Sequence, residues 1–267
     1  MAEFNNTMDV FKLLPKTNCR KCNKPTCLAF AAAVFQGKVS LGDCPFIDKD
    51  TLDVYGAENN QYESRSDSEY LNAMDQLKEK IRQIDLESRA DLLGGMFSND
   101  RLTLKIMGKD FSVDVNGEIS TDIHVNRWIA VPVLNYILSG KGLTLTAKWV
   151  PFRELETSKD WARFFEHQSV RRLKNVADSN PSFFEDIIEL FNGKPVENHY
   201  DADISLIIKP LPLLPLLICY NHPEDGLESD LNLFFDTTAD KNLSIEDIYT
   251  LTTGLANMLE KLAATHG

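Results

Sequence analysis

Four cysteines near the start of this 267-residue chain constrain its N-terminal part more than any other feature. They form the pattern C-x2-C-x4-C-x16-C-P, with Cys19, Cys22, Cys27 and Cys44 followed by Pro45. Three thiols within nine residues cannot all pair in unstrained disulfides, because disulfide geometry is specific. They can hold three corners of a metal centre that a distant fourth thiol closes. The pattern therefore predicts a metal site.

The spacing of these cysteines favours an iron-sulfur cluster over a single ion. Structural zinc usually takes two short ligand pairs, or a histidine close to the cysteines. This chain has no second pair, and no histidine precedes His124. A three-plus-one set of thiolates is a common way to hold a [4Fe-4S] cluster. We therefore predict Cys19, Cys22, Cys27 and Cys44 as its ligands; zinc or another single metal, and thiols without a ligand role, stay open as alternatives.

The residues between the last two cysteines predict a short helix. The run from Leu28 to Gly37 is rich in alanine, which favours helix, and ends at a glycine suited to a left-handed cap. Phe30 and Val34 would cover the cluster, or simply form the core of a small domain. The two interpretations coincide, because so small a module needs a metal to hold it together.

Three stretches of this region resemble a known family. Residues 9–19, 25–31 and 36–39 are similar to the four-cysteine [4Fe-4S] module of the large subunit of corrinoid iron-sulfur proteins. The B subunit of Rnf-type complexes is a less close match. The resemblance covers about residues 8–47. It implies a low-potential cluster on Cys19, Cys22, Cys27 and Cys44 that passes single electrons.

The chain departs from that family at two positions. The family typically has glycine after its first and second cysteines, where this chain has Arg20 and Asn23. Glycine allows backbone amides to approach cluster sulfurs in conformations that other residues adopt with difficulty. We therefore expect the amide hydrogen bonding, and with it the reduction potential, to differ from the family.

Charge is distributed unevenly along the chain. Residues 1–50 have a net charge of +2, so with the whole chain at −12 the remaining residues carry −14. A basic collar of Lys16, Arg20, Lys21, Lys24 and Lys38 accompanies the cysteines. It could raise the cluster potential or dock an acidic partner, although ordinary solvated lysines explain it equally well. The acidic remainder predicts no nucleic-acid binding.

The sequence also predicts a cytoplasmic protein. The N-terminus lacks the charged start and apolar stretch of an export signal. The longest aliphatic run, residues 211–218, is too short to span a bilayer and contains two prolines, so we predict no membrane segment. We expect an anaerobic source, since exposed clusters are easily oxidised. The fifth cysteine, Cys219, is predicted to be a small core residue.

Hydrophobic periodicity divides the chain into a cluster module at 1–50, a polar linker at 51–69 and an α+β domain at 70–267. The expected fold class is α+β, a small [4Fe-4S] module followed by a larger domain with an antiparallel sheet. Asn116-Gly117 is a strong hairpin signal. Helices are predicted at 70–92, 128–138, 159–168, 170–177, 181–191 and 245–262, and strands at 102–106, 111–115, 118–123, 142–150, 204–209, 215–220 and 232–236.

The second domain resembles the family called domain of unknown function 3786, through residues 149–155, 210–216 and 233–236. The resemblance covers roughly residues 70–265 and implies a fold but no chemistry. We find no nucleophile elbow and no glycine-rich phosphate loop, and the catalytic residues stay unknown. The loop 222–225 is a weak site candidate that a solvated turn explains better. Arg153 and Asp236 could be functional, or form a salt bridge or a cap.

Three functions fit these patterns. The first is an iron-sulfur protein that passes single electrons to a redox partner, with a corrinoid methyl carrier or its methyltransferase as the first candidate. The second is an enzyme or cofactor-binding protein whose C-terminal domain binds a small molecule or corrinoid and uses the cluster as its electron source. The third is an adaptor with a structural metal. The partner, the potential and the oligomeric state do not follow from the sequence.

Overall fold

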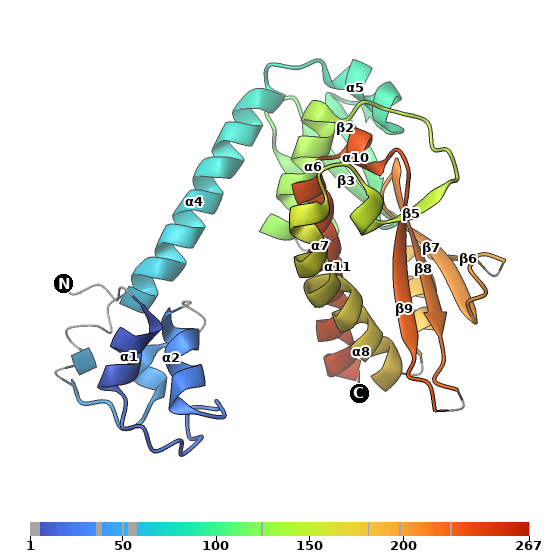
Figure 1. The fold of residues 1–267 in the computed structure, drawn as a ribbon. Helices are drawn as coiled ribbons and strands as arrows, with labels where there is room; N and C mark the ends of the chain where they lie inside the picture. Colours follow the sequence, from blue (N-terminus) through green and yellow to red (C-terminus); the bar gives the residue numbers. More distant parts are fainter. Residues whose placement is uncertain are drawn as a thin grey trace. The chain divides into compact units, whose positions relative to one another are not determined.

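The computed structural model describes residues 6–35, 39–49, 51–52, 58–123, 125–180, 182–197, 199–224 and 226–266 (Figure 1). The chain divides into two compact units, Met1–Ala73 and Met74–Gly267. Within the described residues, no helix is both long enough and apolar enough to cross a membrane.

The N-terminal unit begins with three short helical elements. Helix α1 spans Thr7–Leu13 and is capped by Asn6, whose side chain accepts hydrogen bonds from the amides of Met8 and Asp9. Helix α2 spans Cys27–Phe35, and the 3-10 turn η1 spans Leu41–Asp43. Ser40 and Asp43 form a reciprocal capping box at η1. The helix predicted after Cys27 is confirmed; its predicted end, Gly37, lies outside the described residues.

The core of this unit is small and includes two of the thiols. Val10 and Leu14 of the α1 segment pack with Phe30 of α2 and Leu41 of η1. Cys27 and Cys44 are buried in the same cluster, together with Ala31 and Val34. Phe30 and Val34 thus have the core role that the sequence allowed.

The single helix predicted over 70–92 is wrong, because two helices occupy this region. Helix α4 spans Glu58–Ile81, so it begins within the segment expected to be a linker, and α5 spans Leu86–Leu93. The break occurs at Asp85, whose side chain caps α5 by accepting a hydrogen bond from the amide of Glu87. A local cap therefore outweighs the continuous apolar periodicity.

The first sheet of the C-terminal unit is an antiparallel meander in the order β1-β2-β3-β4. Its strands are β1 (Met96–Ser98), β2 (Arg101–Ile106), β3 (Lys109–Asp114) and β4 (Ile119–Thr121). Leu102 pairs with Val113 and Leu104 with Phe111, and all four side chains are buried. Gly117 has a φ of 81°, so the hairpin predicted at Asn116-Gly117 is confirmed. Strand β1 was not predicted.

The second sheet is antiparallel, with the order β5-β9-β8-β7-β6. Its strands are β5 (Trp149–Pro151), β6 (Lys194–Pro195), β7 (Ile204–Leu211), β8 (Leu214–Asn221) and β9 (Asp230–Asp236). The predicted strands 204–209, 215–220 and 232–236 are confirmed. The strand predicted at 142–150 is wrong over most of its length, since only Trp149 and Val150 of it are paired. Cys219 is buried on β8, as predicted.

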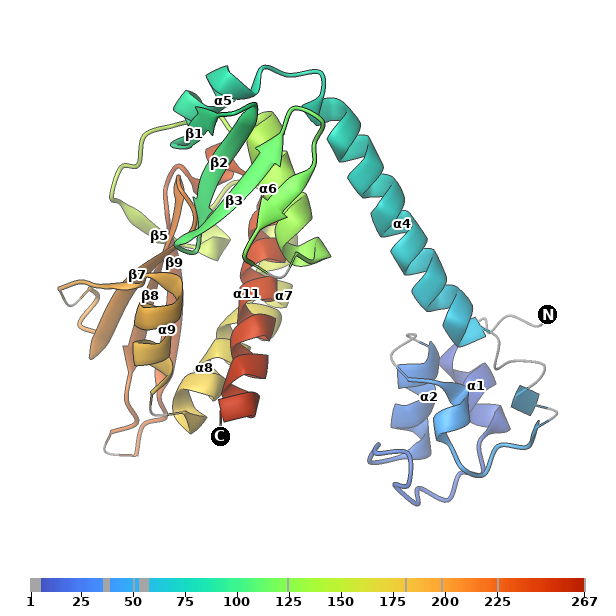
Figure 2. The ribbon, with the colours of Figure 1, turned by 180° about the vertical axis from the view of Figure 1, so that it is seen from behind.

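Helices complete the C-terminal unit. They are α6 (Arg127–Ser139), α7 (Lys159–Phe165), the π-helical turn η3 (Glu166–Val170), α8 (Arg171–Ser179), α9 (Phe183–Phe191), α10 (Ala239–Asn242) and α11 (Ile245–His266), with the 3-10 turn η2 at Phe152–Glu154. Figures 1 and 2 show α11 running beside α6 and α8. Two antiparallel sheets with packed helices confirm the α+β class.

A buried carboxylate ties the irregular segment before β5 to the second sheet. Asp236, at the end of β9, is 1% exposed. It accepts hydrogen bonds from the amides of Thr146 (2.9 Å), Ala147 (2.7 Å) and Thr238 (3.0 Å). Burial raises the pKa of Asp236, but these bonds, with those from the Thr238 and Thr146 hydroxyls, outweigh burial, and the pKa lies below its usual value. Asp236 is therefore a structural residue. Arg153, by contrast, is exposed.

We predict that Asp236→Asn lowers the free energy of unfolding of the C-terminal unit by about 3 kcal/mol at neutral pH, because the buried amide donors lose a charged acceptor. A depressed carboxyl pKa stabilises the fold above the unfolded pKa of about 3.9, and the benefit is lost as the pH falls through the folded pKa. The difference between wild type and variant should therefore shrink in acid. Urea unfolding followed by tryptophan fluorescence measures this unit alone, since Trp128, Trp149 and Trp161 all lie in it. A pH-independent difference would contradict the prediction.

Candidate metal centre

The loop between α1 and α2 carries three of the four cysteines in an unusual backbone conformation. Cys19 is exposed, Cys22 is half-buried and Cys27 is buried as the first residue of α2. Four residues of this loop have left-handed φ values, namely Lys16 (58°), Asn18 (50°), Arg20 (62°) and Asn23 (56°). Each left-handed residue reverses the local direction of the chain, so the loop coils tightly around its cysteines.

Two of these left-handed residues are the ones at which the chain departs from the family pattern. Arg20 follows Cys19 and Asn23 follows Cys22, the positions where the related module has glycine. Glycine adopts a positive φ freely, whereas other residues pay about 1 kcal/mol or more, asparagine least. The loop therefore keeps a conformation suited to glycine without having glycine. The expected change in amide hydrogen bonding stays a prediction.

Asn18 connects the loop to the start of α2. Its amide donates a hydrogen bond to the Cys27 Sγ at 3.4 Å, and its side-chain oxygen accepts one from the Cys27 amide at 2.7 Å. The Thr26 hydroxyl accepts a hydrogen bond from the Ala29 amide at 3.0 Å and caps the helix. Amide donors to a ligand sulfur are one means by which a protein tunes a cluster. No sequence motif indicates this role of Asn18.

The exposed thiol of Cys19 is shifted toward its ligand form. The hydrogen bond from the Lys21 backbone is the largest effect and lowers the pKa of Cys19. Burial opposes it, but the Thr17 hydroxyl and the Lys21 charge add to the lowering, so the pKa lies below its usual value. The thiolate is the form of cysteine that binds metal. The lowered pKa increases the thiolate fraction of Cys19, and the thiolate can bind a cation or a cluster iron.

The remote cysteine is held by the turn before it. The Cys44 amide donates a hydrogen bond to the Leu41 carbonyl at 3.3 Å, which closes η1, and its side chain is 5% exposed. Cys44 and Cys27 belong to one core cluster, and Cys22 packs against it. The structure thus brings these three thiols into one small region and leaves Cys19 at the surface, three residues before Cys22. All four are free thiols.

The donor set fits a cluster better than a single ion. Among the described residues, no three Cys, His, Asp or Glu side chains are grouped as ligands of one metal ion. A cluster bonds each thiolate to a different iron, so its ligands can stand farther apart than those of a single ion. Four free thiols and no nearby histidine also match the preference of iron-sulfur clusters for thiolate ligands. The ligand assignment stays a prediction.

Two residues of the basic collar lie over aromatic rings. The Lys16 Nζ is 5.5 Å from the centre of the Phe11 ring, and the Lys21 Nζ is 5.0 Å from that of Phe46. Phe46 is 51% exposed, and Leu28, which follows Cys27, is 48% exposed. Lys38 lies outside the described residues. The cysteine module therefore presents cations and apolar side chains together on its surface.

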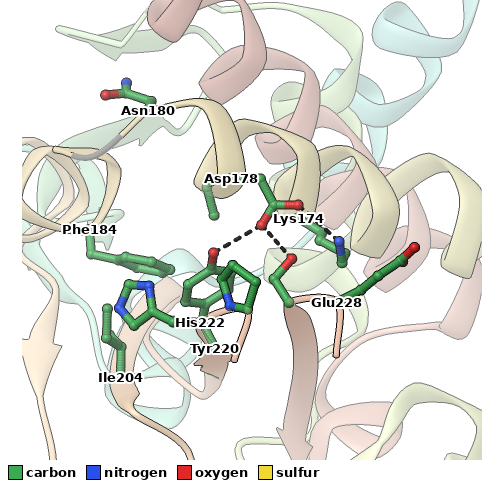
Figure 3. Close-up of a pocket in the computed structure, with 11 residues that line it drawn as sticks. Lys174, Asp178, Asn180, Phe184, Ile204, Tyr220, His222 and Glu228 are labelled. Carbon is green, nitrogen blue, oxygen red and sulfur yellow. Dashed lines mark hydrogen bonds and ion pairs between the residues drawn. The ribbon is translucent and has the colours of Figure 1, made fainter. Parts of the chain in front are cut away.

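The C-terminal unit contains a pocket of about 700 Å³ that includes part of the weak site candidate at 222–225 (Figure 3). His222 and Pro223 line it, and Phe184 and Tyr220 form aromatic walls. Asp225 lies outside the described residues, and His222 is exposed. Two further histidines, His167 and His199, are outside this pocket, and His124 is outside the described residues.

One carboxylate organises the polar side of this pocket. Asp178 accepts hydrogen bonds from Lys174 (2.9 Å), Tyr220 (2.9 Å) and Ser229 (2.6 Å), as Figure 3 shows. Burial raises the pKa of Asp178, but these three donors outweigh it and the pKa lies below its usual value. Burial and the bond to Asp178 raise the pKa of Tyr220. The Tyr220 hydroxyl therefore holds its proton more strongly than an ordinary tyrosine does. Lys174 and Asp178 are neighbours on α8, but Tyr220 and Ser229 come 42 and 51 positions after Asp178, and no motif marked the group.

The fold and the cysteine loop define a two-part protein, a cysteine-rich module with a metal-binding donor set joined to a larger α+β unit. Comparison with family models gives the same division. The model described as "Putative Fe-S cluster" matches residues 14–46, and the model described as "Domain of unknown function (DUF3786)" matches residues 85–258. The chain belongs to the DUF3786 family, and its N-terminal module is of the iron-sulfur cluster type.

Individual relatives match the chain over very different lengths. The chain is 23% identical over 198 residues to the acetyl-CoA decarbonylase/synthase complex subunit gamma of Methanocaldococcus jannaschii, covering 72% of this chain and 37% of that protein. It is 54% identical over 43 residues to the gamma subunit of Methanothermobacter thermautotrophicus, covering 16% and 9%. It is 43% identical over 53 residues to the corrinoid/iron-sulfur protein large subunit of Moorella thermoacetica, covering 19% and 12%. The chain therefore spans well under half of each relative. No solved structure matches significantly.

We predict that Arg20→Gly stabilises the cysteine module by about 1 kcal/mol relative to Arg20→Ala, because only glycine relieves the left-handed backbone at this position. Both variants lose the guanidinium, so their difference isolates the backbone. Hydrogen exchange of the α1 and α2 amides, measured by mass spectrometry, should show slower exchange in Arg20→Gly. Equal protection in the two variants would mean that the backbone there is not strained.

Proposed function

We propose that this protein carries one [4Fe-4S] cluster on Cys19, Cys22, Cys27 and Cys44 and transfers single electrons at low potential to a protein partner. The arrangement of the thiols is the observation that best supports this proposal. Cys27 and Cys44 share a core with Cys22 packed against it, and Cys19 is exposed three residues before Cys22. The iron-sulfur family match over residues 14–46 supports the kind of cofactor.

In this proposal the protein side chains bind and tune the cofactor. The cluster, when bound, supplies one electron at a time. Cys27 and Cys44 would hold its buried side, and Cys19 its exposed side, where a partner can approach. Asn18 would stabilise negative charge on the Cys27 sulfur through its amide. The collar cations would favour the reduced form electrostatically, because reduction adds negative charge.

We propose a corrinoid protein or its methyltransferase as the partner. The two relatives at 43% and 54% identity are a protein named for a corrinoid and one subunit of an acetyl-CoA decarbonylase/synthase complex. A corrinoid carrier that has lost an electron needs one electron to convert Co(II) to Co(I), which a low-potential cluster can supply. The exposed side chains of Leu28 and Phe46 would form the contact surface, together with Lys21, which lies over the Phe46 ring.

The second candidate is an enzyme or cofactor-binding protein whose C-terminal unit binds a small molecule or a corrinoid. The pocket of about 700 Å³ beside Tyr220 and Phe184 favours it, since its volume is typical of ligand sites. In this alternative the cluster would serve as the electron source for the bound molecule. We further propose a cytoplasmic protein of an anaerobe, in which the free thiols stay reduced.

We predict that anaerobically purified protein contains about four iron and four sulfide per chain. Cys44→Ala should lose the cluster or retain a three-iron species, because one iron loses its protein ligand. Cys219→Ala is the matched control, since Cys219 is a buried thiol of the C-terminal unit. Iron and sulfide analysis with electron paramagnetic resonance of the reduced samples measures this. A Cys44→Ala spectrum equal to wild type would refute the ligand assignment.

We predict that the reduced protein converts a Co(II) corrinoid carrier to Co(I) in an anaerobic assay followed by the visible spectrum of the cobalt. One electron should be consumed per cobalt. Lys21→Glu should slow the reaction and make it less sensitive to salt, because the charge that steers the partner is reversed. Lys159→Glu, a change at an exposed lysine of the other unit, is the control. No reduction by a protein that holds a complete cluster would exclude this partner but not the cluster.

A further inference from the structure

A second cavity of the C-terminal unit, about 600 Å³ in volume, lies where the β2–β3 hairpin meets β7 and the end of α9. Three lysines line it, Lys105, Lys194 and Lys209, and its apolar wall includes Phe191, Ile207 and Leu213. It shares no lining residue with the pocket of Figure 3. Nothing in the proposed electron-transfer role uses this cavity.

Three segments far apart in the sequence are fixed around it. The Met107 amide donates a hydrogen bond to the Lys209 carbonyl at 3.0 Å, which attaches the hairpin to β7. Gly108, at the hairpin tip, has a φ of 79°, and a Cβ there would lie 2.8 Å from the Asn192 Cβ. Asn192 itself caps α9 in the left-handed conformation. Backbone contacts therefore hold the segments that form the cavity walls.

Lys194 and Lys209 lie on neighbouring strands at the same cavity. Lys194 of β6 lies directly opposite Ile207 of β7, and Lys209 is two residues further along β7. The pairing of β7 is irregular between Ile208 and Leu211, but both exposed lysines line the cavity, so their side chains border one space. Like charges at such positions repel each other.

The charge around the cavity is not balanced by the protein. No carboxylate lines it. Lys105 is paired with Asp110 at 2.7 Å, whereas Lys194 and Lys209 form no ion pair with any residue that the structure describes. Two unpaired ammonium groups beside one cavity are notable in a chain of net charge −12. An anion bound between them would relieve the repulsion.

We propose that this cavity binds a phosphomonoester with an apolar or aromatic body. A phosphomonoester carries between one and two negative charges at neutral pH, which matches two ammonium groups, whereas a carboxylate carries one. Lysine binds phosphate as a point charge with several donors. Phe191, Ile207 and Leu213 would contact the body of the molecule. A cavity of this volume is typical of small-molecule sites.

The test uses the full-length protein and three probes, phenyl phosphate, benzoate and inorganic phosphate, in titration calorimetry. We expect phenyl phosphate to bind most tightly, because it offers both the charge and the ring. Its affinity should fall with added salt. Lys194→Gln and Lys209→Gln should each lower the affinity for phenyl phosphate by about tenfold, because each variant loses one charge close to the anion.

Controls separate this site from nonspecific binding and from the cluster. Lys159→Gln removes an exposed lysine outside the cavity and should leave the affinity unchanged. The lysine variants should unfold at the wild-type urea concentration, as tryptophan fluorescence measures. The proposal would be overturned if Lys194→Gln and Lys209→Gln bound phenyl phosphate as tightly as Lys159→Gln does. Stronger binding of benzoate, or no saturable binding of any probe, would also overturn it. Cys44→Ala should bind phenyl phosphate normally, so failure of either proposal leaves the other intact.

Discussion

The burial of two free thiols in a very small core is the constraint on which the N-terminal unit depends. Cys27 and Cys44 occupy the centre of a cluster that has only Val10, Leu14 and a few other apolar side chains around it. A core of this size stabilises a fold weakly, and small modules usually add a disulfide or a metal. The described cysteines form no disulfide. What binds the sulfurs therefore determines whether this unit is stable, and the left-handed loop before α2 stores backbone strain that such binding would offset.

The C-terminal unit is stabilised in a different way, through buried polar side chains that hold its irregular segments. Asp236 binds the amides of Thr146 and Ala147, and Asn242, fully buried, binds the amide of Leu143 at 2.8 Å. Both contacts join residues about ninety or more positions apart, the first to β9 and the second to α10. Removing any of them would leave buried donors unpaired. The irregular segments of this unit are therefore held by its own buried polar side chains.

Local patterns predicted the regular parts of the fold well and the irregular parts poorly. The alternation of Leu102, Leu104 and Ile106 fixed a strand, and Asn116-Gly117 fixed a turn, because both depend on neighbouring residues alone. Residues 142–148 alternate like a strand, yet their amides bond to Asp236 and Asn242, which lie about ninety or more residues away. The cysteine spacing predicted the candidate ligands but not Asn18, whose role depends on a left-handed backbone. Neither pocket could be predicted, since each is assembled from elements that are distant in sequence.

The charges in the two pockets decide which kind of ligand the C-terminal unit can hold. Beside Tyr220, the one lysine and one aspartate neutralise each other, with Tyr220 and Ser229 completing the network. That pocket offers aromatic walls and no unpaired cation among its described lining, so it suits a neutral or cationic ring. The lysine-lined cavity has the opposite character, with Lys194 and Lys209 unbalanced by the described residues. The pocket beside Tyr220 and the lysine-lined cavity therefore differ in the charge of the ligand that each would suit. In the proposed function, the cluster belongs to the N-terminal unit, and these two sites belong to the C-terminal unit.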